Sequence, residues 1–207
     1  MASNPKSLLR KIMPTAHRSI LEEKIKIRLK SVTGKVLVIG AGYDPYRDFL
    51  PNATSITITD IDDNLAAIDE IADAHNLTYS NDYYDAIIAI EVFEHLHTPA
   101  KAMAECYRVL SKNGIFICSI PFMFHIHGDP SDYQRITKEG IKRLAKSFDD
   151  ICIEELGGRL AVISDIVTTS NKFLIPLRIF NHFFKLPYIK NFKSKNCPSG
   201  YWIEAKK

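Results

Sequence analysis

The sequence predicts a doubly wound α/β fold with a mostly parallel sheet. From Gly34 onward, short apolar runs alternate with turn residues, a pattern typical of strands that are buried on both faces of a sheet. A helical segment, residues 98–110, separates two of these runs, and strand, helix and strand in this order form a right-handed crossover. The 207 residues, 46% hydrophobic and 25% charged, have the ordinary proportions of one globular domain. Collagen-like, low-complexity and wholly disordered chains are therefore excluded.

The N-terminal segment differs from the rest of the chain. Residues 1–31 place apolar side chains between basic ones, with Pro14 as a break, and predict one or two helices that cover the sheet. We therefore divide the chain into a helical cover, residues 1–33, and a main domain, residues 34–207. Strands are expected at residues 35–39, 55–59, 84–90, 115–120, 151–155 and 201–205.

Two helices follow from local signals in the main domain. Residues 98–110 gather apolar side chains on one helical face, and Asn113 and Gly114 are expected to stop this helix. Thr137 is expected to be the N-cap of a second helix that runs to residue 146.

An insertion, residues 159–196, precedes the last strand and mixes aromatic and aliphatic side chains with cations. The stretch 157–196 contains seven basic residues and one acid, so it carries +6, although the whole chain carries only +3. The total is too small to imply a nucleic-acid partner. One interpretation is a helical lid on the sheet edge with solvated cations. A second is peripheral contact with an anionic membrane surface, and a third is a groove for another protein.

The cysteines and the N-terminus bear on localisation. The four cysteines show no CxxC and no other metal-ligand spacing, so we expect buried thiols in a reduced, cytoplasmic protein and no metal centre. The N-terminus lacks the apolar region of a secretory signal. The longest uninterrupted apolar run, residues 86–90, is five residues long and cannot span a bilayer. Any membrane contact is thus expected at the inner face, through residues 159–196.

Two features at strand ends predict a nucleotide site. The strand at 35–39 runs into Gly40-Ala41-Gly42, where glycines let the backbone turn sharply and approach a ligand. Asp60 ends the next strand, about 20 residues later, where a carboxylate can bind both ribose hydroxyls. A plain strand-to-helix turn and a helix N-cap are the respective alternatives, and the spacing favours the ribose role for Asp60.

A longer pattern resembles a known family. The step Ala72-Asp73-Ala74 and the segment EVFEHL at 91–96, with the glycine turn and Asp60, resemble class I S-adenosylmethionine (SAM)-dependent methyltransferases of the broad small-molecule group, type 11. The resemblance covers roughly residues 34–156 and the last strand. It implies a Rossmann-like sheet of seven strands, SAM as the cofactor and methyltransferase activity.

The resemblance also implies positions for the cofactor contacts. Val38 departs from the family, which usually has an acid two residues before the first glycine, so weaker cofactor binding or a substitute group is expected. His95 lies beyond the strand and is expected to be structural. The implied contacts are Gly40, Ala41 and Gly42 under the methionine portion, Asp60 at the ribose, Ile61 on the adenine face, Asp73 and the Ala74 backbone at the adenine edge, and Glu91 and Val92 at the pocket floor.

The loop after the strand at 115–120 supplies the catalytic candidates. Residues 121–137 resemble the pattern PFxxxIHxxPxDYxRxT of a methyltransferase subgroup often found with bacterial cell-surface polysaccharide synthesis, which implies a sugar or lipid-linked saccharide acceptor. A hydroxyl must lose its proton as it attacks the methyl group, and histidine is the natural general base. We assign this role to His127, with His125 as a lesser candidate. Asp132 would orient His127, while Tyr133 and Arg135 would contact the acceptor or cofactor; alternatively, the last three residues only pin the next helix.

Two rival functions remain open. A nicotinamide-dependent oxidoreductase would share the glycine turn and Asp60, but its pattern requires a third glycine near residues 44–45. A non-catalytic, cofactor-binding scaffold protein would fit the departure at Val38.

Overall fold

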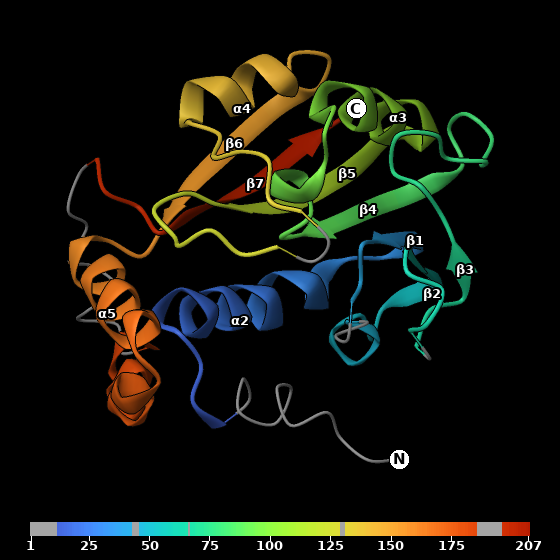
Figure 1. Ribbon diagram of the computed structural model, residues 1–207. Coiled ribbons are helices and arrows are strands. Elements are labelled where there is room, and N and C mark those ends of the chain that lie inside the picture. Colours follow the sequence, from blue (N-terminus) through green and yellow to red (C-terminus); the bar gives the residue numbers. More distant parts are fainter. Residues whose placement is uncertain (1–11, 43–45, 66, 129–130, 186–195) are drawn as a thin grey trace.

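The described residues of the computed structural model form one seven-stranded sheet (Figure 1). The structure describes residues 12–42, 46–65, 67–128, 131–185 and 196–207. The strand order is β3-β2-β1-β4-β5-β7-β6, with β7 antiparallel to both neighbours and the other pairs parallel. The predicted Rossmann-like, doubly wound fold is confirmed. The strands are β1 (Gly34–Ile39), β2 (Ala53–Asp60), β3 (Glu70–Ile71), β4 (Tyr84–Ile90), β5 (Leu110–Pro121), β6 (Asp149–Leu156) and β7 (Gly200–Lys206).

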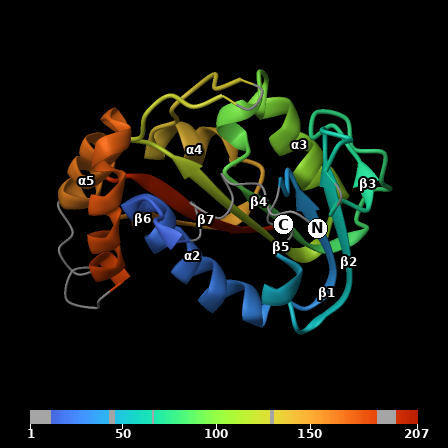
Figure 2. The same ribbon diagram turned by 60° about the horizontal axis from the view of Figure 1, so that its bottom comes forward.

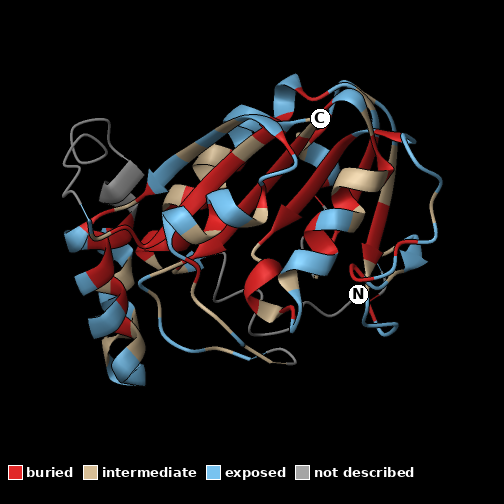
Figure 3. Cartoon of the chain, turned by 90° about the horizontal axis from the view of Figure 1, so that it is seen from above, coloured by how far each residue is buried: buried red, intermediate tan, exposed pale blue. Residues whose placement is uncertain are grey.

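The central strands are buried on both faces, as their continuous apolar runs predict (Figure 3). Val36 and Val38 of β1 pack toward α2 (Ala16–Arg28), whereas Leu37 packs toward α3 (Pro99–Val109) on the other face. This alternation has the two-residue period of a strand. Helices therefore cover both faces of the sheet (Figure 2).

The parallel pairing brings several strand ends to one edge. Ile39 of β1 lies in register with Thr59 of β2, and Ile90 of β4 lies in register with Ser119 of β5. The residues that follow these strands therefore meet at the carboxyl edge, where open α/β sheets bind ligands.

The helix before β5 ends earlier than predicted. It stops at Val109, and Leu110 already has the extended backbone with which β5 begins. Asn113 and Gly114 lie inside β5, so their expected role as a helix stop is wrong. Asn113 instead adopts a left-handed φ of 63°, and its amide donates to the Lys207 carbonyl at 2.8 Å. The later helix is α4 (Lys138–Leu144), and its predicted N-cap is confirmed, because the Thr137 side chain accepts from the Gly140 amide.

The described part of the insertion packs on α2. It contains α5 (Arg159–Ser170) and the 3-10 segment η4 (Lys172–Lys185), while residues 186–195 lie outside the described residues. The buried Asp165 carboxylate accepts from the amides of Ala16 and His17 at 2.6 and 2.9 Å. These are first-turn amides of α2, which have no partner within the helix. α5 therefore completes the N-terminal cap of α2.

Two further expectations concern the thiols and the N-terminal cover. Cys106 and Cys118 are buried as expected, but Cys152 is exposed because it lies on β6, an edge strand of the sheet. Of the cover at residues 1–31, α2 and a short 3-10 turn, η1 (Leu29–Ser31), are seen, and residues 1–11 lie outside the described part. None of the described helices has the length and apolarity that crossing a membrane requires.

Candidate functional site

The predicted glycine turn lies at the carboxyl edge and packs tightly against the end of β4. Gly40 and Gly42 have φ values of 64° and 55°, in the left-handed region that favours glycine. A Cβ atom on Gly40 would lie 2.6 Å from Cγ2 of Val92, whereas one on Gly42 would meet nothing within 4 Å. The two glycines are thus constrained differently, Gly40 by packing and conformation and Gly42 by conformation alone.

The Asp60 carboxylate ties this turn to the end of β2. One carboxylate oxygen accepts from the Gly42 amide at 2.8 Å, and the other accepts from the amides of Ile61 and Asp62 at 2.7 and 3.1 Å. A carboxylate offers about four lone-pair sites, so Asp60 keeps acceptor capacity beyond these three bonds. Asp60 thus combines a structural role with capacity for a hydroxyl donor.

Asp73 is brought to the same edge by β3, a short strand that the sequence analysis missed. The Ala72 amide donates to the Asp60 carbonyl at 2.9 Å, so Asp73 lies one residue beyond this pairing. Burial alone would raise the pKa of Asp73, but hydrogen bonds from the backbone and ring of His75 hold it below its usual value. Ile61 is 63% exposed, which leaves its side chain free to cover a ligand, and Ala74 is buried and can offer only its backbone.

Glu91, predicted to line the pocket floor, is held by protein groups. Its carboxylate accepts from the Ser119 hydroxyl at 2.9 Å and lies 3.2 Å from Nε2 of His17. Burial would raise the pKa of Glu91, but the charge and hydrogen bond of His17 hold it below its usual value. Sequence reasoning missed His17, because no local signal links it to a partner 74 residues away.

The second acid of the EVFEHL segment, Glu94, was also missed. Its side chain is fully buried, and neither carboxylate oxygen forms a hydrogen bond within the described residues. Burial, and then the charge of Glu91, raise the pKa of Glu94 well above its usual value. Nε2 of His95 lies 3.5 Å from Oε1 of Glu94, and Nε2 of His127 lies 3.9 Å from the same atom. The structure therefore gathers three titratable side chains just beyond β4 and β5.

His127 and Asp132 lie together, as the sequence analysis expects. The His127 amide donates to Oδ2 of Asp132 at 2.9 Å, and Nδ1 of His127 lies 3.5 Å from the same oxygen. Burial lowers the pKa of His127 below its usual value. The side chain of His127 is 34% exposed, so a ligand can reach it from solvent.

Arg135 and Tyr133 are placed differently from His127. The Arg135 guanidinium binds the Asp132 carboxylate and donates to the backbone carbonyls of Gln134 and His125, which is the arrangement of a residue that pins the loop. The Tyr133 amide donates to the Glu94 carbonyl at 2.8 Å, and its side chain is 57% exposed. The geometry thus favours the pinning interpretation for Arg135 and leaves the Tyr133 hydroxyl accessible.

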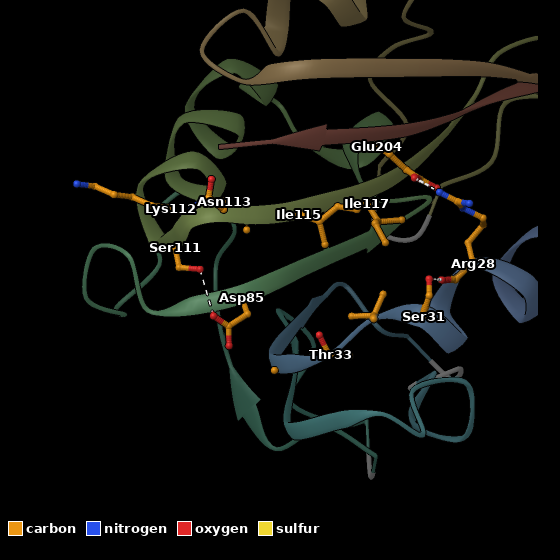
Figure 4. Close-up of a pocket in the computed structure, with 13 residues that line it drawn as sticks. Arg28, Ser31, Thr33, Asp85, Ser111, Lys112, Asn113, Ile115, Ile117 and Glu204 are labelled. Atoms are coloured by element: carbon orange, nitrogen blue, oxygen red, sulfur yellow. Dashed lines mark hydrogen bonds and ion pairs between the residues drawn. The ribbon is translucent and has the colours of Figure 1, made fainter.

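A cavity of about 400 Å³ lies at the opposite, amino edge of the sheet (Figure 4). Gly34 at the start of β1 and Asp85 near the start of β4 line it, and Asp85 accepts from the Ser111 hydroxyl at 3.2 Å. This cavity is therefore distinct from the predicted cofactor site. Residues 43–45, 66 and 129–130, which adjoin the predicted site in sequence, lie outside the described residues.

Comparison with known proteins finds a family model that matches the part of the chain with the predicted cofactor residues. Residues 37–118 match the family model described as "Methyltransferase domain". The matched segment includes the glycine turn, Asp60, Asp73 and Glu91. Methyltransferase activity and SAM as the cofactor, both expected from the sequence, are supported by this match. No protein of curated function matches the sequence.

Solved structures share the fold at low sequence identity. A SAM-dependent methyltransferase from Archaeoglobus fulgidus is 18% identical with a TM-score of 0.63, and the alignment covers 99% of this chain and 100% of that one. Phosphoethanolamine N-methyltransferase 2 from Haemonchus contortus, in complex with S-adenosyl-L-methionine, is 17% identical with a TM-score of 0.58, over 100% of this chain and 60% of that one. The cyclase SpnF is 18% identical with a TM-score of 0.62, over 92% and 81%.

The glycine turn yields a prediction for stability. Gly42→Ala should lower the free energy of unfolding by about 1 kcal/mol, from the left-handed backbone alone. Gly40→Ala should cost clearly more, because its methyl group also collides with Val92. Val92→Ala should recover part of that additional loss in the double variant but should not rescue Gly42→Ala. Urea unfolding of the four variants measures this, and equal losses for the two glycine variants would contradict the packing argument.

Proposed function

We propose that this SAM-dependent methyltransferase methylates a hydroxyl oxygen of a sugar or a lipid-linked saccharide. The observation that carries the proposal is the position of His127, which lies between Asp132 and Glu94 at the carboxyl edge of the sheet. Glu94 is two residues from Val92, which packs against the glycine turn. An acceptor hydroxyl beside His127 would thus lie at the same edge as the cofactor. The pattern of residues 121–137 supports a saccharide within the polysaccharide-synthesis subgroup.

The chain's residues fit the cofactor at this edge. The turn Gly40-Ala41-Gly42 would pass under the methionine portion, with open space where a Cβ on Gly42 would lie, and Asp60 retains acceptor capacity for ribose hydroxyls. Ile61 would cover the adenine face and Asp73 would accept from its amino group. SAM supplies an electrophilic methyl group on a sulfonium. Val38 is fully buried toward α2, so it offers nothing to the cofactor's ammonium group.

Catalysis then depends on orientation and on activation of the acceptor. Holding acceptor and methyl group in line can contribute about 7–11 kcal/mol to lowering the barrier. Assisted removal of the hydroxyl proton adds roughly a hundredfold or more. We assign this activation to Nε2 of His127, because Asp132 faces Nδ1 and fixes the ring. Tyr133, whose side chain is exposed, would contact the acceptor, and Arg135 would hold Asp132 in position.

Membrane contact through the insertion forms part of the proposal. α5 and η4 expose many large apolar side chains although both pack on α2. The stretch 157–196 carries +6, and its one acid, Asp165, is buried at the cap of α2. An anionic membrane surface would bury the apolar side chains of the insertion at the headgroup boundary and attract its cations. The exposed side chains are Leu160, Ile163, Ile166, Val167, Phe173, Leu177, Ile179 and Phe180.

The cofactor assignment predicts the effect of a change at Asp60. Asp60→Asn should weaken SAM binding about tenfold or more, because a charged hydrogen-bond acceptor is lost. Asp62→Asn, two residues further along, is the matched control and should bind SAM normally. Titration calorimetry with SAM and with NAD measures both affinities. Preference for NAD, or equal SAM affinity in the two variants, would refute this cofactor site.

The activation proposal predicts a loss of turnover without loss of cofactor. His127→Gln should lower kcat for methyl transfer to a saccharide acceptor about a hundredfold, while the SAM dissociation constant stays within a factor of two. His125→Gln, in the same loop, should retain turnover. Transfer of a radiolabelled methyl group to lipid-linked saccharides measures the rate, and unchanged turnover in His127→Gln would remove His127 from the mechanism.

The insertion predicts binding to anionic vesicles. The protein should sediment with vesicles that contain phosphatidylglycerol at low salt, and Ile163→Glu with Ile166→Glu should reduce the bound fraction at least threefold. Ile27→Glu, an exposed apolar position on α2, is the control. Binding to neither anionic nor neutral vesicles would instead favour a protein partner or a solvated surface.

A further inference from the structure

Three acceptor atoms converge in the cluster of Glu94, His95 and His127. Oε1 of Glu94 lies 3.5 Å from Nε2 of His95 and 3.9 Å from Nε2 of His127, and one ligand atom of each residue lies within 4.8 Å of the other two. In a tetrahedral zinc site with bonds of about 2.0–2.1 Å, ligand atoms are roughly 3.3 Å apart. Small side-chain shifts would therefore close the cluster around one ion.

The outer contacts of both rings fix which nitrogen bears the hydrogen. Nδ1 of His95 lies 2.6 Å from the Ser131 carbonyl, which can only accept, so Nδ1 is the donor. Nδ1 of His127 likewise faces the His125 carbonyl at 3.3 Å and the Asp132 carboxylate at 3.5 Å. In each neutral ring the lone pair is then on Nε2, the atom that faces Glu94. Such an outer contact is how proteins orient a metal-binding histidine.

The charge of Glu94 is compensated only in part, by the positive charge of Arg135, and by no hydrogen bond from a described residue. Its side chain is fully buried, and neither carboxylate oxygen has a hydrogen-bond partner among the described residues. A buried acid of this kind requires a proton or a cation. Two imidazole lone pairs and a carboxylate that point at one another, with no hydrogen bond donated to the carboxylate by any described residue, are the arrangement that a cation satisfies. Glu91 is not a competing ligand, because its oxygens already contact His17 and Ser119.

We propose that Glu94, His95 and His127 bind one divalent first-row transition-metal ion. Two imidazole nitrogens select such an ion over magnesium or calcium, which prefer ligand sets made of oxygen. Three protein ligands leave a position open, as in catalytic metal sites. Because the side chain of His127 is partly exposed and that of Glu94 is buried, the open position would face solvent beside His127. The cysteine spacing predicts no metal, because these ligands are not cysteines. The relevant signal is Glu94-His95 after one parallel strand and His127 after the next.

The ion's role in catalysis rests on the proposed function, whereas its binding does not. An acceptor hydroxyl at the open position would be acidified by the ion and would release its proton to solvent. His127 would then activate the acceptor as a ligand rather than as a base, because its Nε2 lone pair is used in binding. The loss of turnover expected for His127→Gln is the same in either case.

Metal titration of the full chain tests the site without SAM or acceptor. After treatment with a chelator, the protein should bind one equivalent of Zn²⁺ in competition with a chromogenic chelator. Co²⁺ should produce visible absorption of a low-symmetry site with nitrogen ligands. Glu94→Gln, which preserves shape, and His95→Gln should each weaken Zn²⁺ binding at least tenfold and abolish the cobalt spectrum. His125→Gln should match the parent protein, and circular dichroism checks the fold of each variant.

Two results would overturn the proposal. One is failure of the parent protein to bind a stoichiometric ion, in which case the cluster shares a proton between Glu94 and His95. The other is unchanged affinity and an unchanged cobalt spectrum in Glu94→Gln. An ion that binds as expected in a protein that methylates no saccharide would refute the proposed acceptor but not the metal site, so the two failures are distinguishable.

Discussion

The parallel alignment of β2, β1, β4 and β5 is the constraint on which the site depends. These strands are paired in register, so the segments that follow them begin at a common edge although they are far apart in the chain. The glycine turn, Asp60 and the Glu94 cluster meet there for this reason alone. The antiparallel strand β7 lies between β5 and β6 and adds none of these residues. The candidate site is thus built by segments that follow parallel strands.

Two acids of one segment, Glu91 and Glu94, differ in their surroundings and therefore in their pKa shifts. Glu91 and Glu94 are three positions apart, but Glu91 meets a histidine and a hydroxyl, whereas Glu94 meets two imidazole nitrogens that offer no hydrogen. The first acid is therefore stabilised as an anion by its neighbours, and its pKa is lowered. The second has no hydrogen-bond donor, and its pKa is raised because burial outweighs the opposing charge of Arg135; it is for that reason the more informative residue about function.

The sequence predicted the sheet well because buried parallel strands have continuous apolar runs with clear ends. It did not predict β3, which is only two residues long. It also placed the end of α3 too late, because Asn113 and Gly114 indicate a left-handed turn that can lie either after a helix or within a strand. Gly40, Asp60 and Asp73 could be located from spacing after strands. The contacts of Glu94 and His17 could not, since both are made across the chain by packing. The roles of the cofactor and acceptor residues remain predictions.

The contact between α5 and α2 also connects α5 to the end of β4, through His17. Asp165 holds the amide of His17, and the ring of the same residue holds the carboxylate of Glu91 at the end of β4. A single histidine thus joins the peripheral helix to the edge of the sheet, with its backbone on one side and its imidazole on the other. A displacement of α5 against α2 would therefore be transmitted to Glu91, at the candidate site, through this one residue.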